Sequence, residues 1–96
     1  MALIKQFSIN EKVGDYWVVT EVIYEKMRGF TFPVLSLYEN EAKAKETQTI
    51  GNLQVRIGAK NLITKQRFML KGNFLTIEEI YTELKKLQFF EGAIDA

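Results

Sequence analysis

The segment covering residues 16–24 constrains the fold of this chain more than any other part of its sequence. Its residues are almost all aromatic or β-branched, and such residues favour a strand over a helix. Because side chains alternate along a strand, one face would carry Tyr16, Val18, Thr20, Val22 and Tyr24, and the other Trp17, Val19, Glu21 and Ile23. Both faces are largely apolar, so we predict a central strand. One face would meet the core of its own sheet, and the other a helix or a partner chain.

The same alternation dominates the sequence as far as residue 71 and predicts several further strands. We expect them over residues 3–9, 30–38, 50–57 and 62–70, with a turn over residues 10–15. Pro33 lacks the N–H group that a strand residue donates to its neighbour. The strand that contains Pro33 should therefore lie at an edge of the sheet or carry a bulge at this residue.

A helical period replaces the alternation near the C-terminus. Thr76 and Glu79 have the T-x-x-E spacing of a capping box, and Leu75 and Ile80 flank it with the spacing of a hydrophobic staple. An apolar stripe follows at helical spacing, formed by Ile77, Ile80, Tyr81, Leu84 and Leu87. We predict one helix over residues 77–90, followed by a short extended tail that covers either this domain or a neighbouring subunit.

The length of 96 residues suits a single domain with one core. We predict an α+β domain over residues 1–96 in which a mostly antiparallel sheet of about five strands packs against one C-terminal helix. The β-rich part covers residues 1–71, and its sheet could curl into a small barrel or sandwich. Residues 39–49 contain no large apolar side chain. We expect a charged, flexible loop there, with one short exposed helix as the alternative.

Residue types that common catalytic sites require are missing from the sequence. It has no His and no Cys, which excludes Ser-His-Asp and Cys-His nucleophilic sites and His/Cys zinc sites. The remaining acidic groups fall in the expected loop and on the flank of the expected helix, without the burial that would separate their pKa values. The glycines form no phosphate-binding pattern. We therefore expect neither an enzyme nor a cofactor or metal. The sequence also lacks the roughly 18 consecutive apolar residues that a membrane span needs.

Basic residues gather in the middle of the chain. Residues 47–77 contain five basic side chains and no Asp or Glu, whereas residues 78–96 are mainly acidic. The candidate basic surface consists of Arg56, Lys60, Lys65, Arg67 and Lys71. Alternation places the last three on one strand face, which could follow a phosphate backbone if exposed aromatic rings accompany it. A small nucleic-acid-binding module is therefore an alternative function. The simpler interpretation is a solvated strand face, with the aromatic rings in the core.

The C-terminal residues carry a distinctive order. Residues 81–95 fit the pattern Y-x-x-L-K-x-L-x-x-F-x-G-A-x-D, and shorter pieces occur upstream in matching order: the Met-Ala-Leu start and residues 13–19, 34–38 and 42–45. In this order and spacing the chain resembles short structural proteins of tailed phages and prophages, which belong to the tail region or another part of the virion. Residues 50–75 contribute little to the resemblance.

That resemblance implies a non-enzymatic structural or assembly component of a phage-like particle, located in the virion and assembled in the host cytoplasm. It implies protein–protein contacts, with further copies of the chain or with other virion proteins, and no catalytic residues.

Adjacent side chains on a helix point about 100° apart, so Phe89 and Phe90 cannot both join the apolar stripe. The candidate interface residues are Phe89, Phe90, Ile94 and Trp17. A basic middle and an acidic end also suit head-to-tail packing of copies, as in a closed ring.

Overall fold

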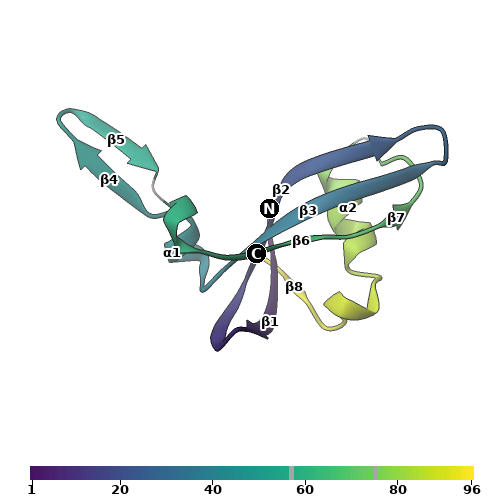
Figure 1. Ribbon diagram of the computed structural model, residues 1–96, viewed down its shortest axis with the longest axis horizontal. Coiled ribbons are helices and arrows are strands. Elements are labelled where there is room, and N and C mark those ends of the chain that lie inside the picture. Colours follow the sequence, from purple (N-terminus) through teal and green to yellow (C-terminus); the bar gives the residue numbers. More distant parts are fainter. Residues whose placement is uncertain (57, 75) are drawn as a thin grey trace.

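The computed structural model describes residues 1–56, 58–74 and 76–96, without the side chains of residues 48–50, 55, 56 and 59. Figure 1 shows the elements, which follow one another along the chain. They are β1 (Leu3–Ile9), β2 (Lys12–Glu25), β3 (Phe30–Tyr38), α1 (Glu41–Ala44), β4 (Thr47–Ile50), β5 (Leu53–Arg56), η1 (Gly58–Asn61), β6 (Leu62–Arg67), β7 (Leu70–Lys71), α2 (Ile77–Leu84), η2 (Gln88–Phe90) and β8 (Ile94–Asp95).

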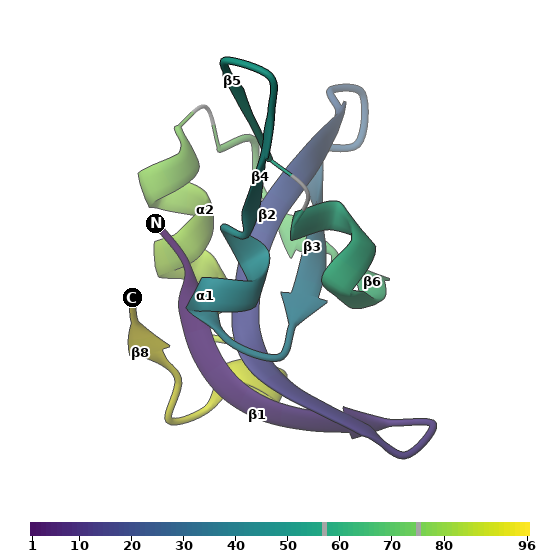
Figure 2. The same cartoon turned by 90° about the vertical axis from the view of Figure 1, so that its left-hand side faces the viewer.

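The main sheet has six strands in the order β6-β3-β2-β1-β8, and β7 pairs with β3 where β6 has ended. All of its strand pairs are antiparallel. The helix α2 packs against one face of the sheet (Figure 2). The predicted α+β class is therefore confirmed, and the sheet stays open instead of closing into a barrel.

The strand β2 is central, as predicted, but its two faces are not those that strict alternation gives. Residues 12–17 pair with β1 and residues 16–25 pair with β3. A bulge lies between Val19 and Glu21, where the pairing with β3 shifts by one residue. An extra residue reverses the parity of everything that follows it. As a result Val22 packs against the core, and Ile23 lies on the opposite face, across from Phe32.

Pro33 lies in an interior strand, so the predicted edge position is wrong. β3 pairs with β2 on one side and with β6 and β7 on the other. The Pro33 carbonyl accepts a hydrogen bond from the Phe68 N–H at 2.9 Å. The nitrogen and oxygen of one strand residue point to the same side, so the proton-free nitrogen also faces β6 and β7. The ladder is interrupted there, between Arg67 and Leu70, so no donor from Pro33 is needed.

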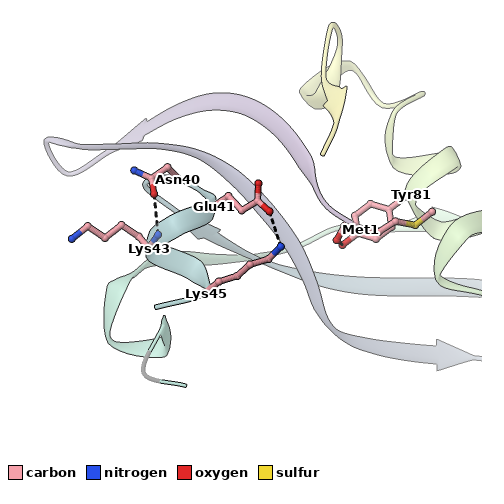
Figure 3. Close-up of polar contacts among 6 residues, drawn as sticks. All are labelled: Met1, Asn40, Glu41, Lys43, Lys45 and Tyr81. Carbon is pink, nitrogen blue, oxygen red and sulfur yellow. Dashed lines mark hydrogen bonds and ion pairs between the residues drawn. The ribbon is translucent and has the colours of Figure 1, made fainter. Parts of the chain in front are cut away.

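Residues 39–56 contain more regular structure than the flexible loop and single strand that we expected, and they include the short exposed helix that was the alternative to the loop. Asn40 caps the one-turn helix α1, because its side-chain oxygen accepts a hydrogen bond from the Lys43 N–H at 2.9 Å (Figure 3). The strands β4 and β5 then form a two-stranded hairpin that projects away from the main sheet (Figure 1). Gly51, with φ of 61°, takes the first position of the two-residue turn between them, where a left-handed backbone favours glycine. Residue 57 lies outside the described residues.

The Thr76 half of the predicted capping box is confirmed at the start of α2. The Thr76 hydroxyl accepts a hydrogen bond from the Glu79 N–H at 3.1 Å and donates one to the Glu79 carboxylate at 2.9 Å. The other half of the predicted staple, Leu75, lies outside the described residues. The helix ends at Leu84, so the predicted helix over residues 77–90 is too long. Leu87 has an extended backbone, with ψ of 144°, and turns the chain into the short helix η2.

Removing this cap should lower stability by a modest, local amount. We expect Thr76→Ala to reduce the free energy of unfolding by about 1 kcal/mol, because one N–H group at the start of α2 loses its acceptor. Thr82 is the matched control. It is an exposed threonine in the same helix, and its hydroxyl only bonds back to the Glu78 carbonyl. Urea unfolding of Thr76→Ala and Thr82→Ala should separate the two, and equal losses would contradict a specific capping role.

The core lies between α2 and the sheet face that it covers. It contains Leu3, Trp17, Leu35, Leu37, Leu70, Ile80, Tyr81, Leu84 and Phe90. Trp17 is at its centre, with the rings of Phe7, Phe68, Phe89 and Phe90 all within 6.4 Å of its own ring centroid. The aromatic residues of β1, β2 and the C-terminal segment thus hold the end of the chain onto the sheet.

Candidate functional site

Two of the four residues expected at a protein interface are buried in the core. The side chains of Trp17 and Phe90 are both 0% exposed, and their rings meet edge to face at 5.6 Å. The Trp17 indole N–H donates a hydrogen bond to the Lys5 carbonyl at 2.9 Å. Side chains buried in this way contribute nothing to a surface of the folded chain. The expectation that Trp17 and Phe90 are available to a partner therefore does not hold.

The other two expected interface residues reach the surface. Phe89 is 36% exposed, and its ring lies 5.3 Å from Phe7, so it forms the outer layer of the aromatic cluster. Ile94 is 64% exposed and belongs to β8, which pairs with β1 at the edge of the sheet. Neither residue lies in a larger apolar surface shared with Trp17 or Phe90, since those two are enclosed.

The C-terminal motif has clear uses within this chain. Its Tyr81, Leu84 and Phe90 are core residues. Lys85 and Asp95 form an ion pair at 2.9 Å, and the Ala96 N–H donates a hydrogen bond to the Ala2 carbonyl at 3.0 Å. Of the two positions expected for the tail, the structure has the one against its own domain.

The candidate basic surface divides into two parts. Lys65 and Arg67 lie on β6 and Lys71 on β7, all exposed. Lys60 lies apart from them in η1, where its ammonium group is 3.9 Å from the Glu46 carboxylate. The side chain of Arg56 lies outside the described residues. The structure therefore brings three of the five basic residues together.

These three basic residues share a sheet face with several residues that the sequence analysis did not connect to them. We use the name open face for the side of the main sheet opposite α2. Cross-strand partners lie on the same face, so the registers place side by side Glu25, Phe30 and Lys71, then Ile23 and Phe32, then Glu21, Val34 and Arg67, then Val18, Ser36 and Lys65. Within the described part of the chain, α1 and η1 lie beyond the end of β3, away from these rows (Figure 1).

The open face has a regular distribution of charge across its strands. Its acidic groups, Glu21 and Glu25, lie on β2, and the basic groups of its strands lie on β6 and β7. Arg28, in the turn after β2, forms an ion pair with Glu25 and lies 5.8 Å from the centre of the Phe30 ring. The strand β3 runs between them with apolar side chains. Acidic and basic edges therefore flank an apolar centre, at about one strand spacing, or roughly 4.8 Å, on each side.

Contacts within the chain organise the basic edge. The Arg67 guanidinium carbon lies 4.5 Å from the centre of the Phe32 ring, a cation–π contact that covers the ring. Phe32 is accordingly only 8% exposed.

On the acidic edge, the hydrogen bond from Arg28, more than the positive charges of Arg28 and Arg67, holds the pKa of Glu25 below its ordinary value. Glu25 is therefore a carboxylate throughout the neutral range.

The sequence did not place Glu21 on this face because of the bulge in β2, and it did not place Glu25 there because the expected strand ended at residue 24. Strict alternation would separate Glu21 from Val18, whereas the structure places them together. The bulged residue is Thr20, whose hydroxyl lies 2.9 Å from that of Ser36 on β3. A threonine followed by an acidic residue in an otherwise apolar strand is the one signal in the sequence that could have indicated the change of parity.

The described residues contain no group of three or more His, Cys, Asp or Glu side chains placed to hold a metal ion. Among the helices in the described ranges, none has the length and apolar character that a membrane span requires. Comparisons with protein-family models, with curated proteins and with solved structures give no match.

Proposed function

We propose that this chain is a non-enzymatic structural or assembly component of a phage-like particle, which acts through protein–protein contacts. The observation that supports this most is the open face, where apolar residues of β3 lie between an acidic and a basic edge. Apolar side chains that gather at a surface often mark a protein–protein contact, and Ile23 on this face is 41% exposed. The C-terminal resemblance to phage structural proteins supports the same function. The place of action would be the virion, after assembly in the host cytoplasm.

A nucleic-acid-binding function is the alternative, because Lys65, Arg67 and Lys71 share one exposed face. Two features of that face argue against nucleic-acid binding. Arg67 covers the Phe32 ring, which leaves little of that ring for a base to stack on. Glu21 and Glu25 lie on the neighbouring strand and would repel a phosphate backbone. The open face therefore offers the positive charge that a phosphate backbone needs along its β6 and β7 edge only.

A titration with labelled single- and double-stranded oligonucleotides separates the two functions. The label on the oligonucleotide has to report binding, because Trp17 is buried and does not sense the open face. We expect no micromolar binding at near-physiological salt, and a molar mass above that of one chain in the same samples by light scattering. Micromolar binding with a steep dependence on salt, lost in Lys65→Glu/Arg67→Glu, would instead support the nucleic-acid function.

A further inference from the structure

We infer that the open face binds the open face of a second copy of this chain, in a dimer whose two-fold axis runs parallel to β3. This inference rests on the proposed function, which it makes specific by naming the surface and the partner. It follows from the order of charges across the strands and from the apolar residues between them.

The centre of the open face is apolar. Phe30, Phe32 and Val34 follow one another on the same side of β3, and Ile23 beside them is 41% exposed. Phe30 and Phe32 have ring centroids 6.2 Å apart. Arg67 already covers the Phe32 ring, so a second sheet stacked at the usual spacing of about 10 Å would remove from water mainly Ile23 and the half-buried Phe30 and Val34.

Two directions of the two-fold axis are compatible with stacked open faces. A two-fold axis that relates two stacked sheets has to lie between them, in the plane of the interface. If it runs parallel to β3, it places the β2 edge of one copy over the β6 and β7 edge of the other, row by row. If it runs across the strands, each strand lies over its own counterpart, and the acidic residues of β2 face one another.

Only the axis parallel to β3 brings opposite charges of the two copies together. In the rows defined by the strand registers, Glu21 comes to lie over Arg67 of the other copy, and Glu25, which is also paired with Arg28 of its own chain, over Lys71 of the other copy. Each pair occurs twice because the interface is isologous. The acidic edge and the basic edge each lie one strand spacing from β3, so the rotation brings the acidic edge of one copy directly over the basic edge of the other. This self-complementarity selects a second copy over an unrelated partner.

The face is small for a stable interface, which indicates a weak and reversible dimer. Three neighbouring strand positions about 4.8 Å apart, taken over the nine-residue length of β3, have a planar footprint of roughly 400 Å². A standard stable interface buries about 800 Å² on each partner. We therefore expect a reversible dimer with a dissociation constant in the micromolar range, weakened by salt because its charged pairs lie at the rim.

Two charge-reversal variants and their mixture provide the test, in sedimentation equilibrium from about 5 to 500 µM. Glu21→Lys/Glu25→Lys makes both edges of the open face basic, and Arg67→Glu/Lys71→Glu makes both acidic. Each variant alone should dimerise at least about tenfold more weakly than the wild type, because four attractive pairs become repulsive. An equimolar mixture should form a heterodimer with an affinity within about threefold of the wild-type value. Circular dichroism and thermal unfolding of each variant check that it is folded.

The variant Glu78→Lys/Glu91→Lys is the matched control, since it makes the same charge change at exposed residues on and after α2. It should dimerise like the wild type. Head-to-tail packing of the basic middle against the acidic end predicts the reverse, with this control impaired and the mixture not rescued. A wild-type chain that stays monomeric at 500 µM would overturn the inference, as would a dimer that none of the reversals on the open face weakens. In the latter case protein assembly through another surface, and with it the proposed function, would stand.

Discussion

Replacing Phe90 by alanine should reduce the free energy of unfolding by about 3–5 kcal/mol, whereas the same change at Phe89 should cost roughly 1–2 kcal/mol. The Phe90 ring is fully buried and packs on Trp17 and on Phe68, with the Phe68 ring 5.2 Å away. Its removal would leave a cavity at the point where the C-terminal segment meets the sheet. Phe89 belongs to the same cluster but is 36% exposed, so water can fill part of the space it leaves.

The two alanine variants are a matched pair, adjacent in sequence and identical in chemistry, and urea unfolding measures both. A domain of this size has a total stability of about 5–15 kcal/mol, so Phe90→Ala could unfold it at 25 °C. Phe90→Leu keeps most of the volume and should cost less than about 1.5 kcal/mol. If Phe89→Ala proved as costly as Phe90→Ala, the burial described here for Phe90 would be contradicted.

Replacing Tyr81 by phenylalanine should cost about 1–3 kcal/mol, because it removes one hydroxyl that makes two hydrogen bonds. The Tyr81 hydroxyl oxygen accepts from the Val19 N–H at 2.8 Å, and its O–H donates to the Met1 carbonyl at 3.0 Å. Figure 3 shows Tyr81 and Met1 side by side. Val19 lies just beyond the last residue of β2 that pairs with β1, so the phenol takes the place of the missing strand partner. Phenylalanine leaves this N–H without an acceptor while the ring still fills the core.

The same tyrosine should make stability depend on alkaline pH. Burial raises the pKa of Tyr81 above its ordinary value of 10.0, against the lowering effect of the hydrogen bond from Val19. The unfolded chain therefore loses this proton at a lower pH than the folded chain does. The corresponding stability is fully present below pH 10 and is lost as pH rises through the folded-state pKa.

Comparison with Tyr81→Phe isolates this contribution from that of the lysines, which titrate in the same range. Urea unfolding between pH 8 and about pH 11.5 should show a steeper loss of stability in the wild type than in the variant. Parallel curves would mean that the Tyr81 phenol ionises equally in both states, contrary to its burial.

The strands that depend on local pattern alone were predictable from the sequence. The predicted ranges for β1 and β3 agree with the structure at both ends. The cap that Thr76 forms on the Glu79 N–H is also as predicted, since this hydrogen bond forms within one turn. These features require only neighbouring residues, so the sequence pattern contains all the information they need.

Other features depend on contacts between distant residues, and sequence patterns did not predict them. The helix α2 stops early because Leu87 turns the chain so that Phe90 reaches Trp17. The interruption that accommodates Pro33 lies on a different strand, after Arg67. The acidic half of the open face was hidden because one bulged residue in β2 reverses the faces predicted for all later residues.

The central claim is that the open face joins two copies of this chain, and the molar mass of the wild type against concentration tests it most directly. At low salt, the average molar mass measured by light scattering should rise from the 11.1 kDa of one chain towards about 22 kDa as the protein concentration reaches several hundred micromolar. Addition of salt should lower it again. A mass that stays at 11.1 kDa over the whole range would contradict the claim.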